Sequence, residues 1–363
     1  MKLLQTNTKE IQEMVGKVAH CVSNNKLIPL TSLVSLSVKD KTFTLTTTDA
    51  TNYFYVSAPG ICPVDDFEFS VFADTFIKLI QKITSENVTF SLDGNILVIE
   101  GNGTYKMELP LNEVGQPIKF PNKLTEVGTK ICSVAVQSIR NIVGTHEKSI
   151  AVDMQVPILT NYFFGEDSVI TSNKKLICYK EESLLAGNIL LSPITVDMIT
   201  SLGDCDVEVY ETESALLFKT DFDTIYSPKI QGAETFPVDK IKAVIEQQFD
   251  SRFSVSRKTM LDVLDRLSLF VSAYDKKAID LTFTEEGILF SSAKSNGAEV
   301  VPFSTCDNFK PFTCTLNIEL LQDALVSQTE DFVDVYFGCP SGIKLESGGI
   351  IQIIAFIDKT KGE

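Results

Sequence analysis

The chain has 363 residues, 44% of them hydrophobic and 22% charged, as in soluble globular proteins with several buried cores. Its formal net charge of −16 argues against a protein that holds nucleic acid tightly through a basic surface, because such binding depends on neutralising phosphates. The eight cysteines form no Cys-x-x-Cys pair, and we find no signal peptide and no apolar stretch long enough to span a membrane. We therefore expect a cytosolic protein with reduced, mostly buried thiols.

Six amphipathic segments recur at intervals of about sixty residues, and each is predicted to form a helix. They begin near Lys9, Phe72, Val136, Thr195, Arg257 and Asn317. The first is expected to run from Lys9 to Asn25, and the second is expected to bury Phe72 with the apolar residues that follow it. Ser192-Pro193 is expected to open the fourth helix, and Ser256 is the predicted cap of the fifth.

Between the helices the hydrophobic period changes to two, which predicts antiparallel strands. The first hairpin is centred on Lys39-Asp40-Lys41, and a later one on Asp93-Gly94. Similar stretches lie at 164–179, 207–226, 281–303 and 333–356. The alternation indicates sheets with one buried face, each covered by a helix.

Odd and even copies of this helix-plus-strands unit differ, so the full repeat is a pair of units. A polar triplet follows the hairpin of each odd copy, at Thr48-Asp49-Ala50, Thr171-Ser172-Asn173 and Ala293-Lys294-Ser295. The pair is about 120 residues long and occurs three times. With links near Phe120 to Thr125 and Gln247 to Ser251, the predicted domains are 1–123, 124–248 and 249–363.

No arrangement of residues in the sequence indicates catalysis. The two histidines, His20 and His146, are interpreted as solvated residues at helix ends. The acidic pairs Asp65-Asp66 and Glu181-Glu182 are interpreted as solvated loop charge, and there is no P-loop and no Gly-x-Ser-x-Gly. We therefore expect no catalytic residue, no metal site and no cofactor.

Several local patterns, in order along the whole chain, resemble those of the bacterial-type DNA polymerase III beta subunit, the beta sliding clamp. They are Leu45-Thr-Thr-Thr-Asp49, Leu159 to Phe164 followed by Thr171-Ser-Asn-Lys-Lys-Leu176, and Thr235-Phe-Pro237. Because overall similarity is low, the resemblance is to a divergent member, bacterial or virus-encoded. It implies an α+β fold of three tandem DNA-clamp domains, each made of two helix-plus-antiparallel-strand halves. Two such chains would join head to tail into a ring of six domains, with the helices around the hole.

The resemblance implies a non-catalytic processivity factor that encircles duplex DNA without sequence preference. Its partners would be the replicative polymerase, the clamp loader, other proteins with clamp-binding motifs and a second copy of the chain, in the cytoplasm, or the host cytoplasm for a viral protein. Residues on the inner helix faces and nearby loops are expected to contact phosphates. They are Lys9, Lys17, Asn25, Lys26, Lys78, Lys82, Arg140, Lys148, Lys258 and Arg266. Asp74-Thr75 and Ile194-Thr195 stand where relatives often carry basic residues, which predicts a less positive inner surface.

The resemblance also implies a hydrophobic cleft between the second and third domains that captures short peptide motifs. Its residues would be Leu159, Thr171, Asn173, Lys174, Lys175, Leu176, Pro237, Ile241, Asn317, Leu320, Ile353, Ile354, Ala355, Phe356 and Ile357. Without the resemblance, Ile353 to Ile357 reads as an ordinary buried strand. The dimer interface would join a domain-one edge strand with Tyr105 and Met107 to the end of the fifth helix, at Phe270 and Val271.

Three other interpretations stay open from the sequence alone. A repeat scaffold that binds proteins without encircling DNA predicts a monomer. A hydrolase with an acidic metal site requires carboxylates that converge from different repeats. A ring of three subunits would also contain identical head-to-tail contacts, although six domains fit two subunits of three domains each.

Overall fold

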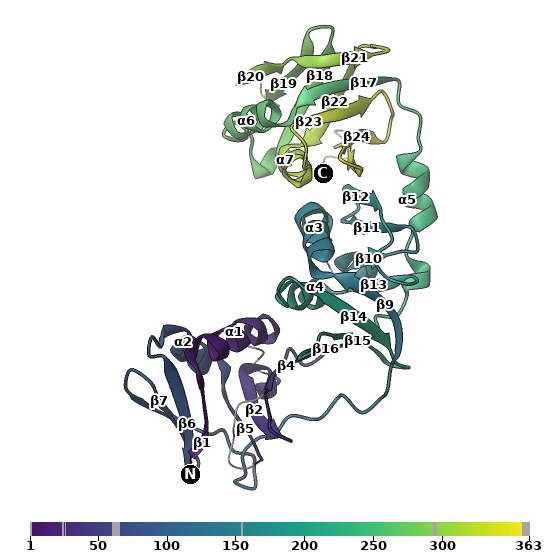
Figure 1. Ribbon diagram of the computed structural model, residues 1–363. Helices are drawn as coiled ribbons and strands as arrows, with labels where there is room; N and C mark the ends of the chain where they lie inside the picture. Colours follow the sequence, from purple (N-terminus) through teal and green to yellow (C-terminus); the bar gives the residue numbers. More distant parts are fainter. Residues whose placement is uncertain are drawn as a thin grey trace. The chain divides into compact units, whose positions relative to one another are not determined.

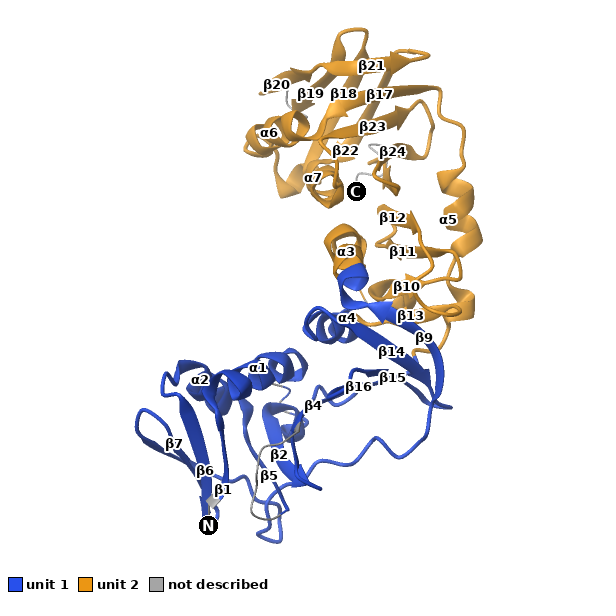
Figure 2. Ribbon diagram, in the orientation of Figure 1, with its two compact units in different colours: residues 1–139, 193–229 blue, residues 140–192, 230–363 orange. Residues whose placement is uncertain are grey.

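The computed structural model describes residues 2–23, 25, 27–59, 66–153, 155–292 and 296–357. It divides into two compact units, residues 1–139 with 193–229 and residues 140–192 with 230–363 (Figure 2). The boundary of the units passes through the predicted middle domain, and helix α3 (Val136–His146) contributes residues to both units. Each unit is described by itself below.

Unit 1 is built from antiparallel strands and three complete helices (Figure 1). The helices are α1 (Thr8–Val18), α2 (Ala73–Lys82) and α4 (Pro193–Thr200). The strands are β1 (Lys2–Asn7), β2 (Leu33–Lys39), β3 (Thr42–Thr48), β4 (Tyr53–Pro59), β5 (Phe67–Phe72), β6 (Asn87–Asp93), β7 (Ile96–Glu100), β8 (Thr104–Glu108), β9 (Thr129–Ala135), β14 (Asp206–Glu211), β15 (Ala215–Lys219) and β16 (Asp223–Pro228).

Unit 2 is also built from antiparallel strands and three complete helices. The helices are α5 (Val238–Ile245), α6 (Arg257–Ser268) and α7 (Ile318–Ser327). Its strands are β10 (Tyr162–Phe164), β11 (Ser168–Ser172), β12 (Leu176–Glu181), β13 (Ile189–Leu191), β17 (Ser251–Ser256), β18 (Ala278–Thr284), β19 (Gly287–Ser292), β20 (Ala298–Val301), β21 (Phe303–Asp307), β22 (Phe312–Asn317), β23 (Phe332–Phe337), β24 (Gly342–Ser347) and β25 (Ile350–Ala355).

Two strand orders each occur three times along the chain. The first order is β1-β6-β7-β8, then β9-β14-β15-β16, then β17-β23-β24-β25. The second is β5-β2-β3-β4, then β13-β10-β11-β12, then β22-β18-β19-β20. All pairings are antiparallel, so the predicted α+β class and the threefold repeat of a paired unit are confirmed.

Strands of neighbouring repeats pair at their edges and fuse the small sheets into larger ones. In unit 1, β4 pairs with β16, with Tyr53 opposite Tyr226 and Val56 opposite Asp223. In unit 2, β12 pairs with β25, with Leu176 opposite Ile354. The results are an eight-stranded and a nine-stranded sheet. We call these two edge-to-edge pairings the first and second joints.

The helices lie in pairs across the buried faces of the sheets. In unit 1, α1 packs beside α2, and in unit 2, α6 packs beside α7 (Figure 1). Asn7, Ser256 and Asn317 precede α1, α6 and α7, and their side-chain oxygens accept backbone N–H groups of the first turn. The predicted cap Ser256 is therefore confirmed.

The predicted helices differ from the structure at three places. The first helix does not reach Asn25, because α1 ends at Val18 and a short 3₁₀ turn, Ala19–Cys21, follows it. Phe72 is half exposed rather than buried, because it is the last residue of β5 and precedes the first turn of α2. Helix α5 was not predicted.

The hairpin ends of the first and second repeats are held in the same way. Thr47 donates its hydroxyl hydrogen to the carbonyl of Val18 at the end of α1, and Thr171 donates to the carbonyl of His146 at the end of α3. Two residues further along, Asp49 and Asn173 each accept two backbone N–H groups of the turn. The third predicted triplet, 293–295, lies outside the described residues.

His146 is fully buried, so its interpretation as a solvated residue was wrong. Its Nε2 lies 3.2 Å from the carbonyl oxygen of Val169, to which it donates, and its Nδ1 lies 2.7 Å from the hydroxyl of Thr145. Burial, helped to a smaller extent by the nearby charge of Lys180, lowers the pKa of His146 from 6.5 to about 4. The side chain is a neutral, hydrogen-bonded part of the core.

Acidification should therefore destabilise the protein through His146. Between pH 6.5 and about 4 the unfolded chain binds a proton at this imidazole and the folded chain does not, so stability is complete above pH 6.5 and falls as the pH falls. At pH 5, proton binding by His146 in the unfolded chain should lower the free energy of unfolding by about 2 kcal/mol. Urea unfolding at several pH values measures it. His146→Gln should be less stable at pH 8 but lose less on acidification, and equal pH slopes for both proteins would contradict the assignment.

Candidate functional site

The six repeat helices differ in charge from the rest of the chain. Together α1, α2, α3, α4, α6 and α7 carry eight Lys or Arg residues and eight Asp or Glu residues, so their formal charges cancel. The whole chain carries −16, so all of the excess negative charge lies outside these helices. Helices whose charges cancel repel a polyanion less than the acidic remainder of the chain does.

Seven of the ten predicted phosphate-binding residues fall into two groups. Lys9, Lys82, Lys148 and Lys258 are exposed, and none of them forms an ion pair within the part of the chain that the structure describes. Lys17, Lys78 and Arg266 are already paired with carboxylates: Lys78 lies 2.6 Å from Asp74 on its own helix. Only the first group offers unneutralised charge to a phosphate.

The three other residues predicted to contact phosphates have different settings. Arg140 is half buried and, with Lys180, lines a cavity of about 440 Å³ near the ends of α3 and α7. Asn25 is exposed, and its side-chain oxygen accepts the backbone N–H of Leu27. Lys26 lies outside the described residues.

Lys17 joins the first and second repeats at the first joint. Its ammonium lies 2.7 Å from Oδ2 of Asp223, the first residue of β16, whose carboxylate is only 3% exposed. The other oxygen of Asp223 has no hydrogen-bond partner among the described residues. The sequence did not reveal this pair because its partners are 206 residues apart.

Arg266 forms a bidentate pair with Glu299 of β20, with distances of 2.8 and 2.6 Å. The hydrogen bonds lower the pKa of Glu299 and raise the pKa of Arg266. Both side chains are accessible to water, so we assign this pair an orienting role between α6 and β20 rather than a large stabilisation.

The predicted peptide cleft lies entirely within unit 2, at the second joint. There Leu176 and Ile354 are opposite each other in the ladder, and Ile353 faces Ile177. Leu159 and Ile241 belong to an adjacent apolar cluster, in which the rings of Phe163 and Phe236 stack 4.3 Å apart. The structure thus brings the apolar members of the prediction to one joint.

Not every predicted cleft residue is free to contact a ligand. Thr171 and Leu176 are fully buried, and Asn317 and Asn173 bond to local backbone groups. Residues that retain exposed surface at the joint are Lys174, Lys175, Pro237, Leu320, Ala355, Phe356 and Ile357. Helix α5 adds Val238 and Ile245, which the sequence analysis missed because the helix itself was missed.

The predicted dimer residues lie on or beside two strands that each have one neighbour among the described strands. Tyr105 and Met107 are on β8, whose only partner among the described strands is β7. Phe270 is 51% exposed and, with the half-buried Val271, follows α6, close to the start of β20. Strand β20 pairs only with β19 among the described strands, and its Val300 is half exposed. Leu269 and Val300 are further exposed apolar residues there that the prediction did not include.

Three buried cysteines have raised pKa values. Burial raises the pKa of Cys21 and Cys314 to about 12, and it also raises the pKa of Cys178, so these thiols stay protonated. Among the described residues, no group of three or more His, Cys, Asp or Glu side chains is arranged to hold a metal ion. Within the same residues, no helix is long and apolar enough to cross a membrane.

Solved structures with the same fold are DNA polymerase III beta subunits, or DNA polymerase sliding clamps. The DNA polymerase III beta chain of Streptococcus pneumoniae aligns with a TM-score of 0.87 and 14% identity, over 99% of this chain and 100% of that one. The beta subunit of Thermotoga maritima aligns with a TM-score of 0.86 and 17% identity, over 99% and 100%. The DNA polymerase sliding clamp of Bacillus subtilis aligns with a TM-score of 0.84 and 16% identity, over 99% of each chain.

The chain therefore has the sliding-clamp fold over its full length. Residues 1–117 match the family of the DNA polymerase III beta subunit, N-terminal domain. A comparison with curated proteins gives no match. The resemblance inferred from the sequence motifs is confirmed, and the low identities agree with a divergent member.

Removing the ammonium of Lys17 should destabilise unit 1. Lys17→Met leaves the Asp223 carboxylate buried without a counter-charge, which we expect to cost about 2 kcal/mol, at the low end because Lys17 is partly exposed. Urea unfolding of the full chain measures the loss, with the exposed Lys9→Met as the matched control. Adding Asp223→Leu to Lys17→Met should recover part of the stability. Equal losses in Lys17→Met and Lys9→Met would show that the pair contributes little.

Proposed function

We propose that this protein is a DNA sliding clamp: two copies close head to tail into a ring that encircles duplex DNA and tethers a polymerase to it. The observation that carries the proposal is the threefold repeat of the same strand order, with repeats joined edge to edge, in a chain whose N-terminal 117 residues match the beta-subunit family. In this proposal the protein has no catalytic activity of its own and acts in the cytoplasm.

At each end of the series of repeats, one strand that could form such a joint has no partner among the described strands, and this supports ring closure. At both joints inside the chain, the last strand of a second-order sheet pairs with the last strand of the next first-order sheet. The strands left over in these two positions are β20 at one end of the series and β8 at the other. Pairing of β20 with β8 of a second copy extends the same rule and closes the ring after two chains.

The internal joints also predict the register of the contact between copies. Tyr55 faces Thr224 at the first joint, and Tyr179 faces Ile351 at the second. Ala298 occupies the position of Tyr55 in its hairpin, and Thr104 occupies that of Thr224. We therefore expect Ala298 of one copy to face Thr104 of the next, with Phe270 and Val300 packed against β8.

The neutral helix layer supports DNA binding that is weak and topological. Lys9, Lys82 and Lys258 supply unneutralised charge, while most other basic residues on these helices are held by carboxylates. Contacts of a few lysines to phosphates do not depend on sequence and release easily, as sliding requires.

The proposal also includes the three domains 1–123, 124–248 and 249–363, and a peptide-binding cleft at the second joint. The apolar residues there, with Phe356 at its rim, would take short motifs of the polymerase, the clamp loader and other replication or repair proteins. The protein scaffold remains the rival, and it differs in predicting a monomer that DNA does not retain.

Disrupting the free edge of β20 should prevent dimer formation. Phe270→Asp and Val300→Asp place charge in the proposed apolar contact, so light scattering should report monomers where the unmodified chain is a dimer. Phe332→Asp is the matched control, since Phe332 is 54% exposed, like Phe270, but lies away from this edge. A monomeric unmodified chain, or a dimer unaffected by both substitutions, would reject the proposed interface.

Encirclement should be visible as retention that depends on DNA topology. Subunits dissociated by dilution and reassociated with closed circular plasmid should stay with the plasmid in high salt, and cutting the plasmid should release them. In low salt, Lys82→Ala should lower the slope of log affinity against log salt for linear duplex by about 1. Lys78→Ala should change it less, because Asp74 already pairs with Lys78. Equal retention on circular and linear DNA would argue against a ring.

A further inference from the structure

A cavity of about 620 Å³ lies beside the first joint, where the first and second repeats meet. It is lined by residues of α1, β9, β14, the loop before β14 and the hairpin of β15 and β16, all of them in unit 1. Its volume is within the range of small-molecule sites, about 300–1,000 Å³. The cavity is therefore large enough to hold a small ligand.

The lining of this cavity is acidic. Its charged groups are four carboxylates and two ammonium groups, which give a formal charge of −2: Asp206, Glu208, Asp221, Asp223, Lys17 and Lys219. Glu208 is paired with Lys130, which lies outside the lining. Asp206 and Asp221 are exposed, and neither forms an ion pair with another of the described residues. The cavity therefore presents negative charge that the chain itself does not neutralise.

The most buried of these carboxylates lacks a hydrogen-bond donor. Asp223 is 3% exposed, and its Oδ2 lies 2.7 Å from the ammonium of Lys17, while its Oδ1 is buried without a partner in the described part of the chain. The backbone N–H groups of Phe222 and Asp223 donate to the hydroxyl of Thr220, so they do not supply the missing donor. Because buried polar groups are normally satisfied, this oxygen points to a donor from outside the chain.

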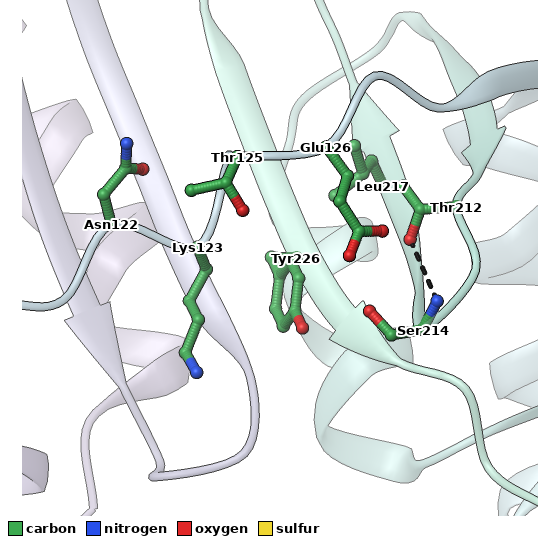
Figure 3. Close-up of a pocket in the computed structure, with 8 residues that line it drawn as sticks. All are labelled: Asn122, Lys123, Thr125, Glu126, Thr212, Ser214, Leu217 and Tyr226. Atoms are coloured by element: carbon green, nitrogen blue, oxygen red, sulfur yellow. Dashed lines mark hydrogen bonds between the residues drawn. The ribbon is translucent and has the colours of Figure 1, made fainter.

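The acidic lining is a local property of the first joint. The second joint has a cavity of about 440 Å³ in which Thr145 and Ile350 take the places of Lys17 and Asp223 in helix and strand. Its charged lining residues are one arginine and one lysine. The pocket of about 240 Å³ in Figure 3 is lined by one acidic and one basic residue. The net charge of the whole chain therefore does not explain the carboxylates at the first joint.

An organic ammonium ion fits this site better than a metal ion does. Among the residues that the structure describes, no group of three or more His, Cys, Asp or Glu side chains is arranged to hold a metal. Leu202 and Phe222 add apolar surface beside the carboxylates, and the ring of Phe222 is half exposed. A methylene chain can contact this surface, and an ammonium group can also lie over the ring. The formal charge of the lining is balanced by a ligand with two positive charges.

We propose that this cavity binds a short aliphatic diamine. One ammonium group bonds to Oδ1 of Asp223, and the other is held by Asp206 and Asp221 at the rim. Because Oδ1 lies beneath the surface of the cavity, the partly exposed side chain of Lys17 shifts to admit the ligand. The proposal does not depend on ring closure or on DNA.

The test is calorimetry of putrescine with the full-length protein. We expect one putrescine per chain, with an affinity that falls on adding salt and falls about fivefold in Asp206→Asn and in Asp221→Asn. Both residues are exposed, so the two substitutions should leave the melting temperature unchanged. Asp93→Asn is the matched control, since Asp93 is exposed at the end of β6 in another sheet, and it should bind normally.

A second variant tests the role of Asp223 without altering it. Lys17→Met removes the ammonium that competes for this carboxylate, so it should bind putrescine more tightly than the unmodified chain does. Putrescine should also raise the melting temperature of Lys17→Met by more than that of the unmodified chain. Equal binding and equal shifts in the two proteins would exclude Asp223 as a ligand.

Three further outcomes would overturn the proposal. One is that putrescine does not bind, or that only lysine-containing peptides do. Another is an equal loss of affinity in Asp221→Asn and Asp93→Asn, which would indicate general attraction to an acidic protein. The third is that Mg²⁺ binds with the same stoichiometry and displaces putrescine at equal concentration, which would assign the cavity to a metal ion.

Discussion

Edge-to-edge strand pairing is the constraint on which the rest of the structure depends. A four-stranded sheet with one helix buries little surface and leaves an unpaired edge, which invites association. The β4–β16 and β12–β25 ladders remove two of these edges by joining successive repeats. Their register places Asp223 where Lys17 of another repeat can reach it, and it brings Leu176 to Ile354. The residues of the predicted peptide cleft lie at one of these joints, and the proposed contact between copies uses β8 and β20, which each have one neighbour among the described strands.

The fold was predictable from the sequence because its signals are local. Apolar spacing predicted six helices, and turn residues such as Asp40 and Gly94 predicted hairpins that the structure contains with left-handed backbone angles. The failures have local causes too. Phe72 was assigned to a helix although it ends a strand. Helix α5 was missed because it starts directly after Phe236-Pro237, which was interpreted as a turn. His146 was misread because a polar residue at a helix end is usually solvated, and only tertiary contact supplies its partners.

The candidate site was predictable only in part, since residue type does not reveal what a side chain already binds. Lys78 and Lys82 look alike in the sequence, yet a carboxylate one turn away neutralises only Lys78. Thr171 and Asn317 were predicted as cleft residues, but Thr171 bonds to the carbonyl of His146 at the end of α3, and Asn317 bonds to the first turn of α7.

Because the strand order occurs three times, equivalent positions can be compared between the repeats of one chain. The tenth residues of α1, α3 and α6 are Lys17, Thr145 and Arg266. Lys17 meets a buried carboxylate, the hydroxyl of Thr145 meets the imidazole of His146, and Arg266 meets a carboxylate of its own repeat. Equivalent positions in the three repeats are thus occupied by side chains that form three different interactions. Substitutions that are tolerated at a site can therefore be sought first among its own counterparts.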